Sequence, residues 1–364
     1  MRDETTSPAI VHPNVAVQSP SIDVIIPTWD RDDLLQKCLD HLRQQTLTSF
    51  QVVVVDNGNG NGRGSISPLL NASPNVRWVR LGKNHGTAVA FNRGLEECLD
   101  TKYVLLLNND VELEPGCLAH LVRALEDNPH YSAAVPKLLQ WANPKLLDGA
   151  GDEILLGGGA YRVGYGELDV GQYDKPESVF SACAAAVLYR RSFLDTVGGF
   201  DEDFFAYRDD VDLCLRAQLR GYRCIYVPQA RARHHGSATL GSPFHPLVIR
   251  LSTRNQIFCL VKNYPTTVLF RVALRLIVFQ ILWVGLAIRK GRFLSWCGGV
   301  LDALRLLPAM WTKRRKVMGS SVLSDEEMLA RFRESEERIR RWQESPYNQR
   351  PSRLLRLYFR IFKR

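Results

Sequence analysis

Acidic side chains directly follow two apolar runs of the sequence, where they could bind a cation or a polar ligand. Asp56 comes after the valine-rich run 51–55, and Asp110 ends the triplet Asn108-Asn109-Asp110 after the run 103–107. A carboxylate at a buried strand end costs free energy unless a cation, a metal ion or hydrogen-bond donors compensate it. Three oxygen-bearing side chains fit a hard divalent ion such as Mg²⁺ or Mn²⁺, whereas Asp56 alone is equally typical of a turn.

A second group of acids lies at 201–212, where six Asp and Glu residues fall within twelve positions. Asp209, Asp210 and Asp212 would stand in the first turn of a helix, whose dipole favours acids there. Helix stabilisation accounts for part of this pattern. Adjacent carboxylates also repel each other, so one of them can keep its proton to a higher pH, which suits a general base.

Two further segments carry groups that could contact a ligand. The run 84–94 opens a predicted helix with small residues, including Gly86 and Gly94, and a helix N-terminus offers free N–H groups to a phosphate. A packing role explains these glycines equally well. His234 and His235 follow a predicted strand. A histidine in a loop is usually polar surface, but beside a metal ion either one could be a ligand.

The elements that must position these residues alternate along the chain. Apolar, β-branched runs predict strands and amphipathic spacing predicts helices, the first of them capped by Asp30. The predicted strands are 22–26, 51–55, 76–81, 103–107, 182–189 and 223–227, and the predicted helices are 31–45, 85–99, 115–127 and 209–220. This order predicts an α/β fold with a mostly parallel sheet and helices on both faces. Ligands of such sheets bind beyond the carboxyl ends of the strands, which would bring Asp56 and Asp110 to one edge.

The charge divides the chain into two parts. The 364 residues carry a net charge of +9, but residues 1–249 have a net charge of −7 and residues 250–364 one of +16. A basic part indicates nucleic acid or an anionic membrane surface as a partner. Residues 1–20 contain three prolines and no periodicity, which predicts a disordered arm. No secretory signal is visible and the eight cysteines form no CxxC pair, so we expect reduced thiols in a cytoplasmic protein.

The basic part is expected to form helices that lie on a membrane. Arg271 and Arg275 interrupt the apolar segment 266–288 and leave 13 uncharged residues, fewer than the ~20 that a spanning helix needs, so we expect an amphipathic helix. The basic cluster 313–316 would add attraction to anionic lipid. The segment 326–344 is charged all round and predicts a solvated helix.

The final segment repeats this amphipathic pattern. Four arginines lie on one side of a predicted helix, opposite apolar residues, as in a helix at a membrane interface. They are Arg353, Arg356, Arg360 and Arg364. An alternative is that the C-terminal helices cover the N-terminal part or form a dimer interface.

Together these motifs resemble family 2 glycosyltransferases with the GT-A fold, from residue 22 to about residue 239. The matching motifs are VIIPT at 24–28, VVVDNG at 53–58, the run 84–94, NND at 108–110, GGFD at 198–201 with DDVDLCLR at 209–216, and HHGS at 234–237. Each motif is weak alone, but six in order are specific. The nearest resemblance is to bacterial rhamnosyl- and galactofuranosyl-type transferases that build cell-envelope glycans.

The resemblance implies a role for each matching residue. Asp210 would be the catalytic base, with Asp209 beside it, while Asp110 and His234 would bind a divalent metal, with His235 as the other candidate. The donor-binding residues would be Pro27, Thr28, Asp56, Asn84, Gly86 and Asn109. Asn108 stands where the familiar acidic triplet has an aspartate, and the lost negative charge should weaken metal binding.

The resemblance also implies the reaction and the partners. We expect an inverting transfer from a UDP- or dTDP-sugar to a glycan or polyprenyl-diphosphate-linked acceptor, with Mg²⁺ or Mn²⁺ holding the diphosphate. Residues 21–249 would form the GT-A catalytic domain, and 250–364 a helical basic region that associates with the membrane or oligomerises. We expect a peripheral protein on the inner face of the plasma membrane and no nucleic-acid partner. Whether the chain forms a homo-oligomer is left open. The alternative is an inactive scaffold that binds nucleotide sugar or glycan at the membrane surface.

Overall fold

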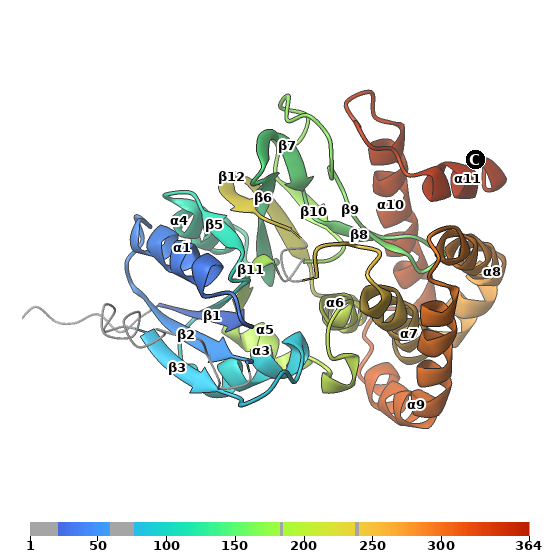
Figure 1. Ribbon diagram of the computed structural model, residues 1–364, viewed down its shortest axis with the longest axis horizontal. Coiled ribbons are helices and arrows are strands. Elements are labelled where there is room, and N and C mark those ends of the chain that lie inside the picture. Colours follow the sequence, from blue (N-terminus) through green and yellow to red (C-terminus); the bar gives the residue numbers. More distant parts are fainter. Residues whose placement is uncertain (1–20, 59–75, 183–184, 237–239, 364) are drawn as a thin grey trace, which may run out of the picture.

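The computed structural model describes residues 21–58, 76–182, 185–236 and 240–363. The arm predicted at 1–20, Cys183, Arg364 and most of the loop after Asp56 lie outside these residues. Among the described residues ten strands form one sheet, in the order β10-β12-β6-β11-β4-β1-β2-β3, with β5 on β12 and β7 on β6. The sheet occupies one side of the molecule, and the helices α7 to α11 lie on the other (Figure 1).

Four parallel strands form the predicted ligand edge. They are β1 (Ile22–Thr28), β2 (Phe50–Asp56), β3 (Val76–Arg80) and β4 (Tyr103–Leu107). β1 pairs with both β2 and β4, and Thr28 stands opposite Asp56 in the register. β1 and β4 are buried throughout, as expected of apolar strands that are covered on both faces. The carboxyl ends of β1, β2 and β4 therefore meet at one edge.

The other half of the sheet is mixed, so parallel pairing is less extensive than predicted. Its strands are β5 (Val111–Leu113), β6 (Ala133–Gln140), β7 (Asn143–Gly149), β10 (Glu177–Val179), β11 (Ala186–Arg190) and β12 (Cys224–His234). β11 runs antiparallel to β4 and β6, while β12 runs parallel to β6 and antiparallel to β5 and β10. In the described part of 133–190 no helix separates the strands, and parallel neighbours need such crossovers. A small separate sheet pairs β8 (Asp152–Ile154) with β9 (Ala160–Arg162).

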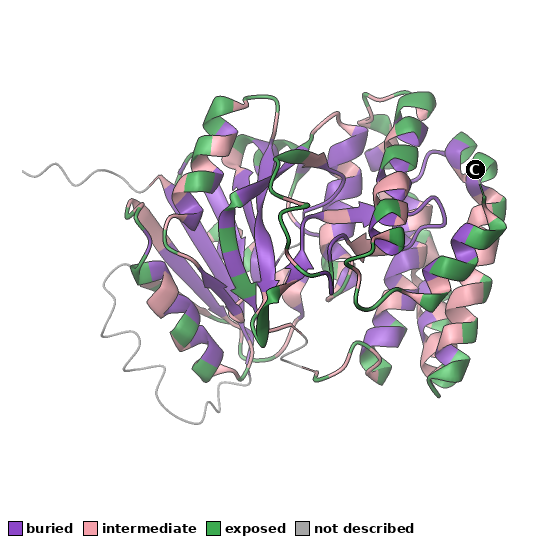
Figure 2. Ribbon diagram, turned by 90° about the horizontal axis from the view of Figure 1, so that it is seen from above, coloured by how far each residue is buried: buried purple, intermediate pink, exposed green. Residues whose placement is uncertain are grey.

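Helices cover both faces of the large sheet, as predicted. α1 (Asp32–Arg43) and α4 (Cys117–Asp127) contribute Leu35 and Leu121 to one core cluster. α3 (Thr87–Glu96), α5 (Arg191–Val197) and α6 (Asp209–Leu219) contribute residues such as Phe91 to the other. Figure 2 shows the buried strands between these layers. The predicted cap at Asp30 is wrong: Asp30 has a left-handed backbone with φ of 51°, and α1 begins after Arg31 without a side-chain cap.

The basic part folds into five helices against the sheet-bearing part. They are α7 (Pro246–Asn263), α8 (Thr266–Arg289), α9 (Phe293–Gly319), α10 (Asp325–Glu344) and α11 (Arg353–Ile361). α7 packs between α6 and α9, and α10 packs on β8. The prediction that 326–344 is solvated is wrong, because Met328, Phe332 and Ile339 of α10 are fully buried. Charged residues occur on all sides of this helix, so its apolar stripe was not recognised in the sequence.

The final helix uses its apolar face for packing within the protein. Leu355, Tyr358 and Phe359 of α11 are buried against α8 and α10. The predicted membrane-interface helix at the chain end is therefore wrong for this face, which packs on the other C-terminal helices and, as in the alternative, on two residues of the N-terminal part, Leu155 and Val163. The apolar residues are opposite the arginines as predicted, but protein covers them.

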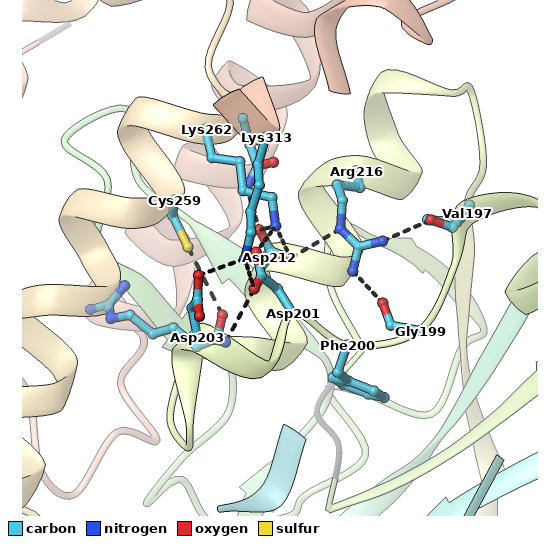
Figure 3. Close-up of polar contacts among 12 residues, drawn as sticks. Val197, Gly199, Phe200, Asp201, Asp203, Asp212, Arg216, Cys259, Lys262 and Lys313 are labelled. Atoms are coloured by element: carbon cyan, nitrogen blue, oxygen red, sulfur yellow. Dashed lines mark hydrogen bonds and ion pairs between the residues drawn. The ribbon is translucent and has the colours of Figure 1, made fainter. Parts of the chain in front are cut away.

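A buried ionic cluster joins the basic part to α6. Lys262 Nζ of α7 lies 2.9 Å from Asp212 Oδ1 and 2.6 Å from Asp201 Oδ2, and Arg216 Nε donates to Asp212 Oδ2 at 3.0 Å. Lys313 of α9 pairs with Asp201 and with Asp203 at 2.7 Å. Figure 3 shows both lysines converging on these aspartates.

The cluster makes stability depend on pH in the acid range. Burial alone would raise the pKa of Asp212, but the charges of Lys262 and Arg216 lower it from 3.8 to about 2. A folded-state pKa below the unfolded one contributes stability that is present above the unfolded value. This contribution is therefore present above pH 3.8 and is lost as the pH falls through about 2.

We expect Lys262→Met to destabilise the fold strongly. The variant leaves Asp212 and Asp201 buried without their shared lysine, and breaking a buried ion pair costs about 3–5 kcal/mol of unfolding free energy. The matched control is Lys102→Met, whose partner Glu126 is exposed and whose pair contributes about 0–1 kcal/mol. Urea unfolding of the full chain measures both. Equal losses in the two variants would contradict a structural role for the cluster.

Candidate active site

The ends of β1 and β2 are tied together by side chains of the predicted donor site. Asn109 Nδ2 donates to Thr28 Oγ1 at 2.9 Å, and the backbone N–H of Asn57 donates to Thr28 O at 2.8 Å. Asp56 Oδ1 accepts from the backbone N–H of Gly58 at 2.9 Å. Asp56 thus stabilises the turn after β2, which is the role that an aspartate commonly has there. Thr28 lies beside it and is buried.

Asn57 holds the segment that leads into α3. Its Nδ2 donates to Asn84 Oδ1 at 3.2 Å and to Gly86 O at 3.1 Å, and its Oδ1 accepts from the N–H of His85 at 2.8 Å. Gly86 has φ of +89°, and a Cβ there would lie 2.1 Å from Phe205 O, so only glycine fits. Asn57 was not predicted as a site residue, although its place directly after Asp56 at a strand end was a signal.

Pro27 takes a structural place in the same edge. It stands in β1 opposite Val55 of β2 and is buried. Proline has no N–H to donate in a strand ladder. Any contact that Pro27 makes with a ligand would therefore come from its ring or its carbonyl group.

The loop before α6 has a strained backbone. Phe205, Tyr207 and Arg208 have positive φ values of 64°, 66° and 63°, which non-glycine residues rarely adopt. Asn255 of α7 holds the loop: its Nδ2 lies 2.9, 2.9 and 2.6 Å from the carbonyl oxygens of Phe204, Ala206 and Tyr207. Asn255 is fully buried. Strain of this kind concentrates at functional sites, and here it sets where α6 begins.

The two acids that open α6 have different surroundings. Asp209 is buried and accepts a hydrogen bond from Thr87 Oγ1 at 3.0 Å. Burial, followed by the charge of Asp210, raises its pKa to about 7. Asp210 is half-buried, and its charge also adds to the effect of burial that raises the pKa of Asp152 to about 6. Asp210 is thus more accessible than Asp209. Its two acidic neighbours, Asp209 and Asp152, both have a raised pKa.

The remaining acids of 201–212 have internal partners. Asp201, Asp203 and Asp212 belong to the ionic cluster with Lys262 and Lys313, and Glu202 Oε1 accepts from Asn92 Nδ2 at 3.0 Å. The acidic segment therefore divides into a structural set and the pair Asp209 and Asp210.

Asp110 and His234 lie together on the other side of the site. His234 Nε2 is 3.4 Å from Asp110 Oδ1, and its Nδ1 is 2.7 Å from Asp148 Oδ2. Burial alone would lower the pKa of His234, but the hydrogen bonds of Asp110 and Asp148 raise it to about 9. The reverse holds for Asp110: burial would raise its pKa, and His234 lowers it. Arg162 extends the chain of contacts from Asp148 to Asp152, 3.5 Å from Arg162 Nε, and so toward Asp210.

The structure separates the two neighbouring histidines. His234 is the last residue of β12, which continues past the predicted end at 227 through an irregularity between Val227 and Arg231. His235 instead places its Nε2 3.1 Å from Glu112 Oε1, and its ring stacks on Trp141. Only the His234 ring faces Asp110. Asp148 was not predicted as a site residue because it lies in no motif recognised in the sequence.

The donor atoms of Asp110 and His234 fit a divalent ion in part. Carboxylate oxygen and imidazole nitrogen are both ligands of Mn²⁺-type ions. Among the described residues no group of three or more His, Cys, Asp and Glu side chains is arranged to hold an ion. Two protein ligands leave several positions for oxygens of a ligand or water. His234 must also lose its ring proton before it can bind a metal.

The family model for glycosyl transferase family 2 matches residues 23–198. Residues 23–198, slightly less than half of the chain, therefore form a family 2 glycosyltransferase domain, and the sheet that contains them has the GT-A fold.

Curated relatives agree with this assignment. The O-antigen biosynthesis protein RfbC of Myxococcus xanthus is 31% identical over 248 residues, which cover 65% of this chain and 19% of the relative. The N-acetylglucosaminyl-diphospho-decaprenol L-rhamnosyltransferase of Mycobacterium tuberculosis is 26% identical over 242 residues, which cover 60% of this chain and 78% of the relative. The chain thus spans a fifth of the first relative's length and about three quarters of the second's.

Solved structures share the fold. S. aureus TarS 1–349 in complex with UDP-GlcNAc superposes with a TM-score of 0.53 at 15% identity, covering 88% of this chain and 92% of that one. GalNAc-T7 with UDP, GalNAc and Mn²⁺ superposes with a TM-score of 0.53 at 14% identity, covering 66% of this chain and 48% of that one.

We expect the ring of His234 to titrate near pH 9 in the metal-free protein, since two carboxylates stabilise its protonated form. Asp148→Asn removes one of these charges and should lower the midpoint. Glu112→Gln, the matched control, removes the partner of His235 and should leave His234 unchanged. NMR of histidine-labelled protein measures both rings. A midpoint near 6.5 in the unmodified protein would show that the carboxylates do not act on this ring.

Proposed function

We propose that this protein transfers a sugar, with inversion at the anomeric carbon, from a nucleotide-sugar donor to a hydroxyl group of a glycan or lipid-linked glycan. The observation that carries the proposal is the placement of Asp210. Its half-buried carboxylate opens α6 beside the buried Asp209, and its charge acts on Asp152, which Arg162 links through Asp148 to the Asp110–His234 pair.

Donor binding falls to the edge formed by β1, β2 and α3. The side chains of Thr28 and Asp56 stand at adjacent strand ends, and they would contact the nucleoside. Asn84 and Gly86, held by Asn57, lead into α3 and would lie beside the donor, while the first turn of α3 already donates from Ala88 N–H to Phe205 O at 3.2 Å. Asn109 belongs to this set because it donates a hydrogen bond to the Thr28 hydroxyl. Pro27, next to Thr28 at the end of β1, completes it.

Asp110 and His234 would hold a divalent ion, Mg²⁺ or Mn²⁺. When bound, such an ion supplies positive charge that neutralises the departing nucleoside diphosphate. Asn108 adds no negative charge where an aspartate would, so the protein contributes one carboxylate and one ring nitrogen. The Mn²⁺ in the GalNAc-T7 structure supports this choice of ion.

Asp210 would act as the general base. Its carboxylate would accept the proton of the acceptor hydroxyl while that oxygen attacks the anomeric carbon and the bond to the diphosphate breaks. The transition state resembles an oxocarbenium ion, as in glycoside hydrolysis. Burial and the charge of Asp210 raise the pKa of Asp209 to about 7, so Asp210 is the residue that we propose as the base. Asp209 would orient the loop through its bond to Thr87.

The acceptor in this proposal is attached to a polyprenyl diphosphate, and the donor is a UDP- or dTDP-sugar. The name of the M. tuberculosis relative, a transferase acting on a diphospho-decaprenol compound, supports a lipid-linked acceptor. Such an acceptor would bring the protein to the inner face of the plasma membrane. Residues 21–249 would then form the catalytic domain, and 250–364 the part that faces the membrane.

We expect Asp210→Asn to bind the donor normally and to lose transfer by roughly 10²–10⁴-fold, the usual contribution of a general base. Asp203→Asn is the matched control, because Asp203 lies in the same acidic segment but pairs with Lys313. Release of nucleoside diphosphate measures transfer, and the thermal shift with donor measures binding. Normal turnover of Asp210→Asn would remove this residue from the mechanism.

A second variant tests the metal site. Asp110→Asn should abolish the extra rise in melting temperature that Mn²⁺ adds to a nucleotide-sugar donor, because binding stabilises by mass action. Glu112→Gln, two residues away beside His235, should retain it. If Asp110→Asn kept the full metal-dependent increment, the ion would have to bind elsewhere.

A further inference from the structure

Helix α8 presents an apolar stripe to solvent. The stripe consists of Phe270, Leu274, Ile277, Ile281 and Ile288, whose spacing puts them on one helix face. Phe270 is 79% exposed, Leu274 66% and Ile281 62%. In Figure 1, α8 lies at the outer edge of the helical part, away from β3. Soluble monomers rarely leave a contiguous apolar surface of this kind uncovered.

The opposite face of α8 is fixed to the protein. Val272 and Phe279 are buried, Trp283 Nε1 donates to Thr253 Oγ1 of α7 at 2.9 Å, and Arg275 pairs with Glu336 of α10 at 2.6 Å. α8 and α9 are long and apolar enough to cross a membrane, judged by length and composition alone. Little of the apolar stretch of α8 is buried inside the protein. With protein on one side and a single free stripe on the other, α8 has the surroundings of a helix that lies on a bilayer and does not cross it.

A basic cavity adjoins this stripe. It encloses about 270 Å³ between α8, α10 and the end of the chain, and Arg271, Arg275, Arg333, Arg340 and Lys363 line it. The carboxylates of Glu336 and Glu337 line it too, which leaves an excess of positive charge. Arg333 and Lys363 have no carboxylate within 4.0 Å among the described residues. Among the described residues, the cavity therefore offers two cations, those of Arg333 and Lys363, that no carboxylate within 4.0 Å neutralises.

The stripe and the cavity are neighbours on the first turns of α8. Phe270 and Leu274 precede the cavity residues Arg271 and Arg275 by one position each. An amphiphile whose chains met the stripe would place its polar group within reach of the cavity. Arginine is well suited to this role, since its guanidinium binds phosphate through two parallel hydrogen bonds.

We propose that this face docks on an anionic membrane, with the stripe in the interface and the phosphate head group of an anionic phospholipid in the basic cavity. The proposal rests on the membrane location given above and adds the surface and the lipid chemistry. Charge favours lipid over a second copy of the chain: residues 265–324 contain ten Lys and Arg and a single acid, Asp302. Some of them point into the protein, such as Lys313, but Arg289, Lys290 and Arg305 are exposed. Two copies face to face would bring such exposed cations together, whereas anionic lipid neutralises them.

Flotation of the full chain with vesicles tests the proposal. We expect strong binding to phosphatidylglycerol–phosphatidylcholine vesicles and at least tenfold weaker binding to pure phosphatidylcholine. Leu274→Glu should abolish flotation, while Val170→Glu, which places the same charge on an apolar residue 55% exposed elsewhere, should not affect it. The double variant Arg333→Gln/Lys363→Gln should lose the preference for phosphatidylglycerol, and Arg123→Gln, an exposed arginine on α4, should keep it.

Four outcomes would overturn the proposal. Unchanged flotation of Leu274→Glu would exclude the stripe, and a dimer in free solution that Leu274→Glu dissociates would make the stripe a homodimer interface. Protein that stays with the membrane after carbonate washing would be spanning it. Inorganic phosphate that displaces the protein from vesicles would make the cavity a site for free phosphate.

The same variants separate this proposal from the proposed function. The thermal shift with a nucleotide sugar reports on the donor site, and Leu274→Glu should leave it unchanged. If flotation failed while donor binding persisted, only the docking surface would be wrong. If the chain floated as expected but bound no nucleotide sugar, only the catalytic assignment would fall.

Discussion

The site depends on a short loop that is held in an unfavourable backbone conformation. Phe205, Tyr207 and Arg208 are left-handed, and such residues cost about 1–3 kcal/mol each. Asn255 offsets this cost by reaching three carbonyl groups of the loop from α7. Because the loop leads directly into Asp209 and Asp210, a side chain of the basic part sets the position of the proposed base. The C-terminal helices are therefore part of the scaffold of the site.

Aspartates in this protein differ in role because their partners differ. Asp212 meets Lys262 and Arg216, which lower its pKa, and it joins two parts of the fold. Asp209 is buried beside another carboxylate, and both effects raise its pKa although its hydrogen bond with Thr87 lowers it. Asp110 pairs with His234, which also pairs with Asp148. The residue type gives a carboxylate in each case. Its burial and the groups beside it decide whether that carboxylate joins two parts of the fold, has a raised pKa or pairs with a histidine.

Local pattern predicted most of the first half of the fold and the acids at the strand ends. β1, β2 and β4 appear where β-branched runs stand, and Asp56 and Asp110 follow them because parallel strands end at one edge. In the mixed half, the strands predicted at 182–189 and 223–227 correspond to β11 and β12. The strands β5, β6, β7 and β10 and the antiparallel pairings were not predicted, because these pairings join strands that are distant in sequence. Asn57, Asp148 and Asn255 were missed for a related reason: each acts on a segment brought near by tertiary contacts, and only Asn57 lay inside a recognised motif.

The C-terminal helices show what amphipathic spacing leaves open. In α11 the apolar face packs inward against α8 and α10 and the arginines face outward, so the pattern describes ordinary packing. In α8 the arginines at 271 and 275 turn toward the glutamates of α10, and an apolar stripe faces solvent. Charges inside an apolar run thus mark the protein-facing side of α8, because carboxylates of a neighbouring helix neutralise them there. The free side has no such partner among the described helices, and its apolar residues are exposed to solvent, so any apolar surface that covered them would remove them from water.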